Sequence, residues 1–333
     1  MQTNMNRRKF IAATAAGTGL LALDSTKLAA EILKTSTMPL RPLGKMGWMI
    51  SIVGFGGGSR YLTQKNLDVA EQMIHRAVEL GVNYFDTGYS YMTGEVRESH
   101  RRYGRFLTPN YRDRIYLSTK LHARDAETAK RHFEQTLNDL KTDHLDVLHF
   151  HGLASTEDID KILAKDGALS MYRKWKEEGS IRAIGITGHS DSKVIAEGLR
   201  RIRPDCVMCP FNPAHANTRR GYKGLDFGRD VIPYALEHGI GVLAMKTTAQ
   251  NQLIGRGGVS AEQLIRYALT LPIDAAVIGM PTLEIVESNA SIARTLKPMP
   301  DPERRKMSER LSVAAADGTL FYTAAGYCDG TWA

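Results

Sequence analysis

This chain of 333 residues has few cysteines, no long apolar run and only a modest excess of positive charge. Its three cysteines are too few, and odd in number, for a disulfide framework. No apolar run approaches the roughly 18 residues that span a bilayer, so we expect no stable transmembrane span. Residues 1–30 hold four basic side chains and one acidic side chain, so the formal net charge of +8 falls to +5 without them. So small a surplus does not predict nucleic acid as a partner.

Two of the cysteines, Cys206 and Cys209, have the CxxC spacing of a redox or metal motif. They lie in an apolar run that is typical of a buried strand, in which positions three apart face opposite sides. We therefore predict that both thiols fill the core, and we predict no metal site.

What the chain does contain is a regular alternation of short apolar runs and amphipathic segments. Apolar residues make up 43 % and charged residues 24 %, as in an ordinary globular protein. Eight aliphatic or β-branched runs recur about every thirty residues, at 52–56, 83–86, 115–120, 146–151, 181–187, 206–210, 241–246 and 275–279. That period is one βα unit, and uninterrupted apolar runs are typical of parallel strands that are covered on both faces.

The segments between these runs carry helix start and stop signals. Asp125 is placed as an N-cap, Ser260 and Gln263 form a capping box, and Gly81 follows an apolar stripe as a stop. A hairpin is expected at 43–52 and a charged helix at 301–311. The pattern predicts an α/β fold, a (β/α)8 TIM barrel with an N-terminal hairpin across its bottom and a C-terminal helical tail. We divide the chain into a signal segment (1–30), the barrel (31–300) and the tail (301–333).

The first thirty residues resemble an export signal rather than part of the fold. Arg7 and Arg8, followed by Lys9 and Phe10, precede a mild apolar stretch at 11–23, which is the order of a secretory signal. The paired arginines resemble the twin-arginine motif, which implies the twin-arginine export machinery as a partner and a periplasmic or exported location. The cleavage site is poorly defined, so an uncleaved signal that tethers the protein stays open. A frayed basic amphipathic terminus is the alternative interpretation.

Four chemically active side chains follow three successive predicted strands. Asp86 ends the second run, Tyr91 comes five residues later, Lys120 ends the third run and His151 ends the fourth. Each alone also fits a solvated loop or a structural histidine. Catalytic groups of a barrel, however, gather at the carboxyl ends of its strands. We therefore expect these four side chains to converge on one point.

This set of groups suits the reduction of a carbonyl. The alkoxide that forms needs a proton, and a free tyrosine, whose pKa is near 10, is a weak acid at neutral pH. A lysine cation within hydrogen-bonding distance lowers that pKa. In this interpretation Tyr91 donates the proton while Asp86 holds Lys120 charged and oriented. His151, as a neutral donor, positions the carbonyl oxygen.

The same segments resemble those of the aldo-keto reductase family. Residues 85–91 resemble the segment with the family's catalytic aspartate and tyrosine, 118–120 the lysine segment, and 146–151 the segment that ends in the histidine. Further matches at 179–186, 211–213 and 276–279 extend the resemblance over about residues 39–296. It implies an NAD(P)-dependent oxidoreductase that moves hydride between a nicotinamide cofactor and an aldehyde, ketone, alcohol or sugar-like substrate, with Tyr91 as the proton donor.

The resemblance also implies where the cofactor binds. The implied positions lie at strand ends and in the last loop: Gly56, Thr187, Gly188, Met208, Lys246, Gly279, Met280 and Asn289. Thr187-Gly188 stands where a Ser-Asn pair is frequent, and Met208 where a glutamine is frequent. No lysine or arginine occurs at 279–289 to bind a 2′-phosphate, so NADP(H) or NAD(H) stays unresolved. Lys246 either reaches a cofactor phosphate or pairs with a carboxylate.

Three further features have two interpretations each. The glycines at 54–58 fall short of a Rossmann fingerprint because Ser59 stands where the third glycine is needed, so we take them as a glycine-lined first loop. His149 is either a barrel-interior histidine with satisfied hydrogen bonds, which we favour, or a second polar group below the site. Cys328 resembles a remnant of the cysteine-rich tails that bind iron–sulfur clusters in some relatives, but one thiolate cannot supply that site.

Two rival functions are compatible with the same barrel. A nicotinamide-binding sensor or assembly subunit would have no need of Tyr91, and a metal-dependent hydrolase would need clustered histidine and carboxylate ligands. The long loop at 211–227 bears on the substrate, because its polar cluster favours an anionic or sugar-like ligand or else forms a solvated face. That cluster consists of His215, Arg219, Arg220, Tyr222 and Lys223.

Overall fold

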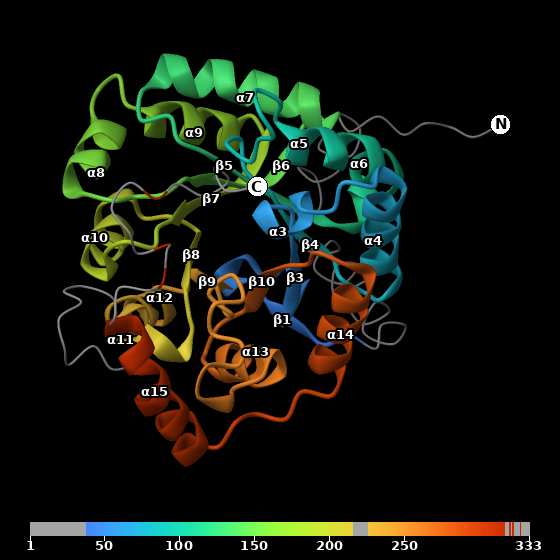
Figure 1. The fold of residues 1–333 in the computed structure, drawn as a ribbon. Coiled ribbons are helices and arrows are strands. Elements are labelled where there is room, and N and C mark those ends of the chain that lie inside the picture. The colour runs from blue at the N-terminus through green and yellow to red at the C-terminus, as the bar shows by residue number, and fades with distance from the viewer. Residues whose placement is uncertain (1–37, 216–225, 317–319, 321, 323–326, 328–333) are drawn as a thin grey trace, which may run out of the picture. The chain divides into compact units, whose positions relative to one another are not determined.

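Eight parallel strands close into a barrel, as the sequence pattern predicts (Figure 1). The computed structural model describes residues 38–215 and 226–316, together with Leu320, Tyr322 and Tyr327. The strands are β3 (Val53–Gly56), β4 (Tyr84–Asp86), β5 (Tyr116–Leu121), β6 (Leu145–Phe150), β7 (Ile181–Thr187), β8 (Cys206–Pro210), β9 (Gly241–Met245) and β10 (Ala275–Gly279). They pair in sequence order, and β10 closes the ring against β3. Three predicted strands match these bounds, and the other five differ by one residue at one end or both.

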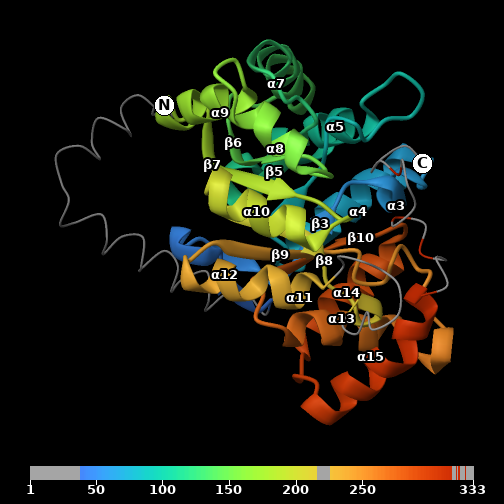
Figure 2. The ribbon, with the colours of Figure 1, turned by 90° about the vertical axis from the view of Figure 1, so that its left-hand side faces the viewer.

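Helices cover the outside of the barrel, as two views at right angles show (Figure 1, Figure 2). They are α3 (Ser59–Leu62), α4 (Leu67–Glu79), α5 (Glu98–Arg102), α6 (Thr108–Tyr111), α7 (Ala126–Leu140), α8 (Thr156–Leu163), α9 (Ala168–Glu177), α10 (Ser192–Ile202), α11 (Phe227–Asp230), α12 (Ile232–Glu237), α13 (Ala261–Thr270), α14 (Leu283–Arg294) and α15 (Asp301–Ala316). The predicted caps are confirmed: Asp125 accepts from the amide of Thr128, and both bonds of the capping box at Ser260 and Gln263 form. Among the described residues, no helix is both long and apolar enough to cross a membrane.

A hairpin covers the end of the barrel at which the strands begin. Its arms are β1 (Leu40–Pro42) and β2 (Met49–Ser51), so the hairpin begins before the predicted start at 43. The turn between them donates the amide of Gly44 to Asp274 Oδ2 at 3.0 Å and the amide of Lys45 to the carbonyl of Gly239 at 2.8 Å. Asp274 directly precedes β10, and Gly239 lies two residues before β9. The hairpin therefore closes the bottom of the barrel, as predicted.

The core has an inner and an outer layer that the strands separate. Val147, Ala183, Met208 and Leu243 belong to the cluster inside the barrel, and a larger cluster packs the outer strand faces against the helices. Cys206 is in the inner cluster and Cys209 in the outer one, and both are free, fully buried thiols. Burial raises the pKa of both thiols well above its ordinary value. Two thiols on opposite faces of one strand are core residues and not a redox pair, as expected.

The C-terminal tail builds a third, smaller hydrophobic cluster. Helix α15 extends past its predicted end, and its Met307 and Leu311 pack with Leu320 and Tyr322 against Leu253. Residue 253 follows strand β9 at the carboxyl end of the barrel. The tail therefore packs against a loop at the end of the barrel opposite the hairpin.

Candidate active site

The four predicted catalytic side chains meet at the carboxyl ends of the strands. Asp86 is the last residue of β4, Lys120 lies in β5, and His151 directly follows β6. Tyr91 lies in the loop after β4, where glycines line its ring: a Cβ on Gly88 would come within 3.2 Å of it. All four side chains are buried, with exposed fractions of 1–8 %. The sequence prediction of one converging group is thus matched by the geometry.

Lys120 connects the members of this group. Its ammonium donates to Asp86 Oδ2, to the carbonyl of Thr87 at 2.7 Å and to the hydroxyl of Tyr91 at 3.4 Å. The other carboxylate oxygen of Asp86 accepts from Ser118 Oγ at 2.8 Å. An ammonium has three protons to donate, and these three acceptors match that number. A buried lysine that is held in this way directs positive charge at the phenol oxygen.

His151 is held beside Tyr91 by its neighbours. The two rings meet edge to face with centroids 5.8 Å apart, and His151 Nδ1 lies 3.5 Å from Ser90 Oγ. On its other side, the ring of His122 lies 4.1 Å away, centroid to centroid. Arg124 fixes the backbone by donating to the carbonyl of His151 at 2.9 Å. The sequence analysis missed Ser90 and His122, although both stand within one or two residues of predicted catalytic positions.

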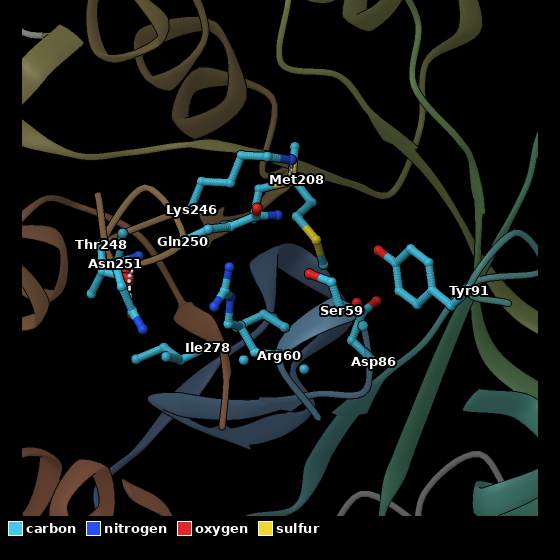
Figure 3. A pocket seen from close by; sticks show the side chains of 16 residues that line it. Ser59, Arg60, Asp86, Tyr91, Met208, Lys246, Thr248, Gln250, Asn251 and Ile278 are labelled. Carbon is cyan, nitrogen blue, oxygen red and sulfur yellow. Dashed lines mark hydrogen bonds between the residues drawn. The ribbon is translucent and has the colours of Figure 1, made fainter. Parts of the chain in front are cut away.

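A pocket opens beside this group (Figure 3). In that view Tyr91 and Asp86 lie on one side, Thr248 and Asn251 on the other, and Arg60 between them. The pocket is lined by Gly56, Gly58, Ser59, Arg60, Asp86, Tyr91, Met208, Met245, Lys246, Thr247, Thr248, Gln250, Asn251, Val277, Ile278 and Gly279. Four of the eight predicted cofactor positions are therefore in the lining, next to two of the catalytic ones.

The other four predicted cofactor positions do not line this pocket. The hydroxyl of Thr187 accepts from the amide of Gly152 at 3.0 Å, and Gly188 packs so tightly that a Cβ would lie 2.4 Å from Ile195. Met280 is fully buried in the outer core. Its side chain therefore packs in the core, whereas we expected it to contact the cofactor. Asn289, on α14, is also buried, but its Nδ2 has no hydrogen-bond partner among the described residues. A buried amide donor without a partner is the feature expected of a ligand contact.

Two loops contribute pocket residues that the sequence analysis did not single out. The first loop, after β3, supplies Gly58, Ser59 and Arg60, and the loop after β9 supplies Thr247, Thr248, Gln250 and Asn251. The glycines at 56–58 were a signal for the first loop. Nothing comparable marks the second, which contains no glycine or proline in residues 246–251. The cluster proposed at 211–227 lies largely outside the described residues, as do Cys328 and the signal segment.

His149 lies inside the barrel, as predicted, and has less hydrogen bonding than the satisfied interior histidine that we favoured. It lies two residues after the interior residue Val147, on the same face of β6, and pairs in register with Lys120. The ring interacts with the backbone of Ile186 and otherwise has no hydrogen-bond partner among the described residues, and it fills space that Gly185 leaves by lacking a Cβ. Burial, with the charge of Lys120, holds the pKa of His149 well below its ordinary value. The ring is therefore neutral and adds no positive charge below the site.

The comparisons with known proteins agree with this geometry. The model of the aldo/keto reductase family matches residues 52–279. The chain belongs to the aldo/keto reductase family. Aldo/keto reductases use NAD(P)H to interconvert carbonyls and alcohols, so this chain is an NAD(P)-dependent oxidoreductase.

Several aldo/keto reductases and related enzymes are similar to the chain over much of its length. L-galactose dehydrogenase of Arabidopsis thaliana is 28 % identical over 227 residues, which cover 66 % of this chain and 68 % of that protein. An uncharacterized oxidoreductase of Bacillus subtilis is 30 % identical over 187 residues, 53 % of this chain and 56 % of that one. The holo form of an aldo-keto reductase from Bacillus halodurans superposes with a TM-score of 0.63 at 21 % identity, covering 82 % of this chain and 96 % of that one. This last likeness is one of fold.

The described residues fit the nicotinamide dinucleotide that aldo/keto reductases bind. Lys246 and Arg60 bring positive charge to the pocket from two loops, and Gly56 and Gly279 line it without side chains. The stem of Arg60 rests on Gly279, because a Cβ there would lie 2.8 Å from the Cβ of Arg60. Among the described residues, no group of three or more histidine, cysteine or acidic side chains is arranged to hold a metal ion.

Proposed function

We propose that Tyr91 is the proton donor of this aldo/keto reductase and that its substrate is a hydroxylated, sugar-like carbonyl compound. The observation that carries the first part is the set of contacts of Lys120, which joins the carboxylate of Asp86 to the hydroxyl of Tyr91. A cation in contact with a phenol stabilises the phenolate that remains when the proton leaves. In this proposal Tyr91 is the general acid, and Lys120, held by Asp86, lowers the pKa of its hydroxyl.

The other residues have roles that follow from their positions. When bound, the cofactor supplies the hydride, and the residues around it orient the substrate and exclude water. His151, buried beside Tyr91, donates to the carbonyl oxygen and holds it within reach of the phenol. Gly56, Met208, Lys246 and Gly279 hold the cofactor along the pocket. In the reverse direction Tyr91 takes back the proton, by microscopic reversibility.

The polar surroundings of His151 support a hydroxylated substrate. Ser90 and His122 are half-buried beside the catalytic ring, and His189, in the loop after β7, packs against Tyr327. Such donors and acceptors can bind the hydroxyl groups of a substrate. L-galactose dehydrogenase, which is similar over two thirds of the chain, acts by its name on a sugar.

The experiment is a turnover assay with NADH and NADPH against aldoses and alkyl aldehydes of equal length. Tyr91→Phe should lower kcat by about 10²–10⁴-fold, which is the usual range for general acid catalysis, with an unchanged Kd for nucleotide. Tyr111→Phe is the control, because Tyr111 packs on the surface against His75. Turnover by Tyr91→Phe at the wild-type rate would contradict the assignment. A higher kcat/KM for alkyl aldehydes than for aldoses would contradict the substrate class only.

We also propose that the protein works outside the cytoplasm with its cofactor tightly held. The support is Arg7-Arg8 and the apolar stretch behind them, because the twin-arginine route carries folded proteins. Nicotinamide cofactors are made inside the cell, so an exported enzyme needs to fold around its nucleotide first. It would then cycle one bound nucleotide between two substrates.

A further inference from the structure

The loop after β9 has an unusual backbone. Lys246, Ala249, Gln250 and Asn251 all have positive φ, between 49° and 74°, and none of them is glycine. This left-handed conformation is unfavourable for residues with a Cβ. Four such residues within six persist only where surrounding contacts hold them, and such strain is concentrated at functional sites. We call residues 246–251 the β9 loop, and all of them except Ala249 also line the cofactor pocket.

The C-terminal tail supplies contacts that hold the β9 loop. The ammonium of Lys246 lies 5.5 Å from the ring centre of Tyr322 and 5.3 Å from that of Tyr327. Gln250 Nε2 donates to the hydroxyl of Tyr327 at 2.9 Å. Asn212 Nδ2 is shared between the carbonyl of Lys246 at 3.0 Å and the hydroxyl of Tyr322 at 2.9 Å.

Hydrophobic packing reinforces these contacts from below. Ala249 of the β9 loop and Leu253 just after it are fully buried in the cluster that the tail builds with Leu320 and Tyr322. Without the tail, this side of the loop would lose its core. The C-terminal tail is therefore part of the structure that holds the β9 loop in place.

A ring face is a suitable partner for a cation that has to bind phosphate. It attracts the ammonium through its quadrupole but does not cancel the positive charge, as a carboxylate would. The two ring contacts therefore help to hold the ammonium of Lys246 in position at the pocket. Tyr322 and Tyr327 also lack any charge of their own that would repel a diphosphate.

We propose that Tyr322 and Tyr327 are positioning residues that hold the β9 loop and Lys246 against the bound dinucleotide and so slow its release. The inference rests on the proposed function, in which the cofactor stays on the protein. Tyr322 and Tyr327 act through Lys246 and Gln250, and the strained loop makes their contacts necessary. The tail thereby determines how long the cofactor stays bound, and other residues bind the substrate.

The test measures nucleotide release directly, on the full chain. Bound NADH or NADPH is displaced by excess oxidised nucleotide and followed by its fluorescence. Tyr327→Phe, which keeps the ring and loses the bond from Gln250, should speed release about 3- to 10-fold. Tyr327→Ala, which also loses the ring face, should speed release about 10- to 100-fold, with kcat at saturating cofactor nearly unchanged. Tyr234→Phe on α12, where the ring stacks on His238, is the matched control and should release nucleotide as the wild type does.

A double-mutant cycle separates positioning from general weakening of the fold. If Tyr327 acts through Lys246 as well as Gln250, then in a Lys246→Met background Tyr327→Ala should speed release by no more than the roughly 3- to 10-fold expected for loss of the bond from Gln250. Fully additive effects, or release at the wild-type rate in both Tyr327 variants, would overturn the proposal. So would an altered KM for the carbonyl with unaltered release, which would place the tail at the substrate. Wild-type protein that binds nucleotide but turns over no carbonyl would refute the proposed function and leave this inference intact.

Discussion

At the scale of single residues, the active site depends on a buried charge pair. Lys120 and Asp86 are 1 % and 3 % exposed, and their contact also determines where Tyr91 can receive positive charge. Burying an ion pair is expensive unless every remaining donor and acceptor is satisfied, and Thr87 and Ser118 satisfy them here. The arrangement serves the acidity of Tyr91 more than it serves stability.

Lys120→Met tests this dependence through pH. Removing the cation raises the pKa of the phenol. The basic limit of carbonyl reduction, where the acid loses its proton, should therefore move to higher pH while kcat falls. The variant also leaves Asp86 buried without its cation, at a cost of about 3–5 kcal/mol in the free energy of unfolding. The double variant Lys120→Met/Asp86→Asn removes both charges. It therefore leaves no buried unpaired carboxylate that could prevent folding.

The measurement is the pH–rate profile of both variants beside Lys176→Met. Lys176 pairs with Asp205 on the surface and should behave as the wild type does. An unchanged rate and an unchanged basic limit in the Lys120 variants would remove Lys120 from the mechanism.

At the scale of elements, the hairpin shows how one close contact fixes a piece of structure. Gly44 and Gly47 both have positive φ, at 48° and 70°, within the same turn. A Cβ on Gly44 would lie 2.4 Å from the amide nitrogen of Gly241, whereas a Cβ on Gly47 would meet nothing within 4 Å. The two glycines therefore share a backbone requirement, and only Gly44 has a packing requirement as well.

Alanine substitutions separate these two requirements. Gly47→Ala should cost about 1–2 kcal/mol in the free energy of unfolding, which is the price of a left-handed residue with a Cβ. Gly44→Ala should cost a further ~1–3 kcal/mol, because the hairpin has to shift away from the start of β9. Urea unfolding of both variants measures the difference. Equal destabilisation would contradict the tight packing of Gly44 against the start of β9.

At the scale of the whole molecule, buried histidines couple stability to pH. His100 and His149 are both fully buried, and burial lowers the pKa of His100 to about 3. His149 is shifted in the same direction. Both folded-state pKa values lie below the unfolded value near 6.5. As pH falls below 6.5 the unfolded chain binds protons that the folded chain does not, so stability present above that pH is lost.

The free energy of unfolding should therefore fall by about 1.4 kcal/mol per pH unit for each of these histidines between pH 6.5 and 5. His100→Gln keeps a polar group for Thr119 and should reduce the slope by one histidine. His238→Gln, at an exposed position, should leave it unchanged. Denaturant titrations at several pH values give the slopes, and equal slopes in His100→Gln and the wild type would contradict the linkage.

The proposed location is also a property of the whole chain. Arg7→Lys with Arg8→Lys keeps the charge but removes the guanidinium pair, and should leave the protein in the cytoplasm. Lys27→Arg is the control and should not change fractionation. Protein recovered from the periplasm should release nucleotide that mass spectrometry identifies as NAD or NADP. Wild-type protein that fractionates with cytoplasmic markers would refute export, and periplasmic protein that neither contains nor binds nucleotide would refute tight retention.

The sequence by itself determined the barrel and its catalytic group. Strands covered on both faces leave uninterrupted apolar runs, and a barrel places the carboxyl end of each run at the site, so Asp86, Lys120 and His151 were predictable from position alone. What only the tertiary structure decided is the direction and surroundings of side chains in loops. Met280 turns into the core, Arg60 crosses over Gly279, and the β9 loop adopts a left-handed backbone beneath two tail tyrosines. These features depend on packing between segments far apart in the chain, and no local pattern encodes that.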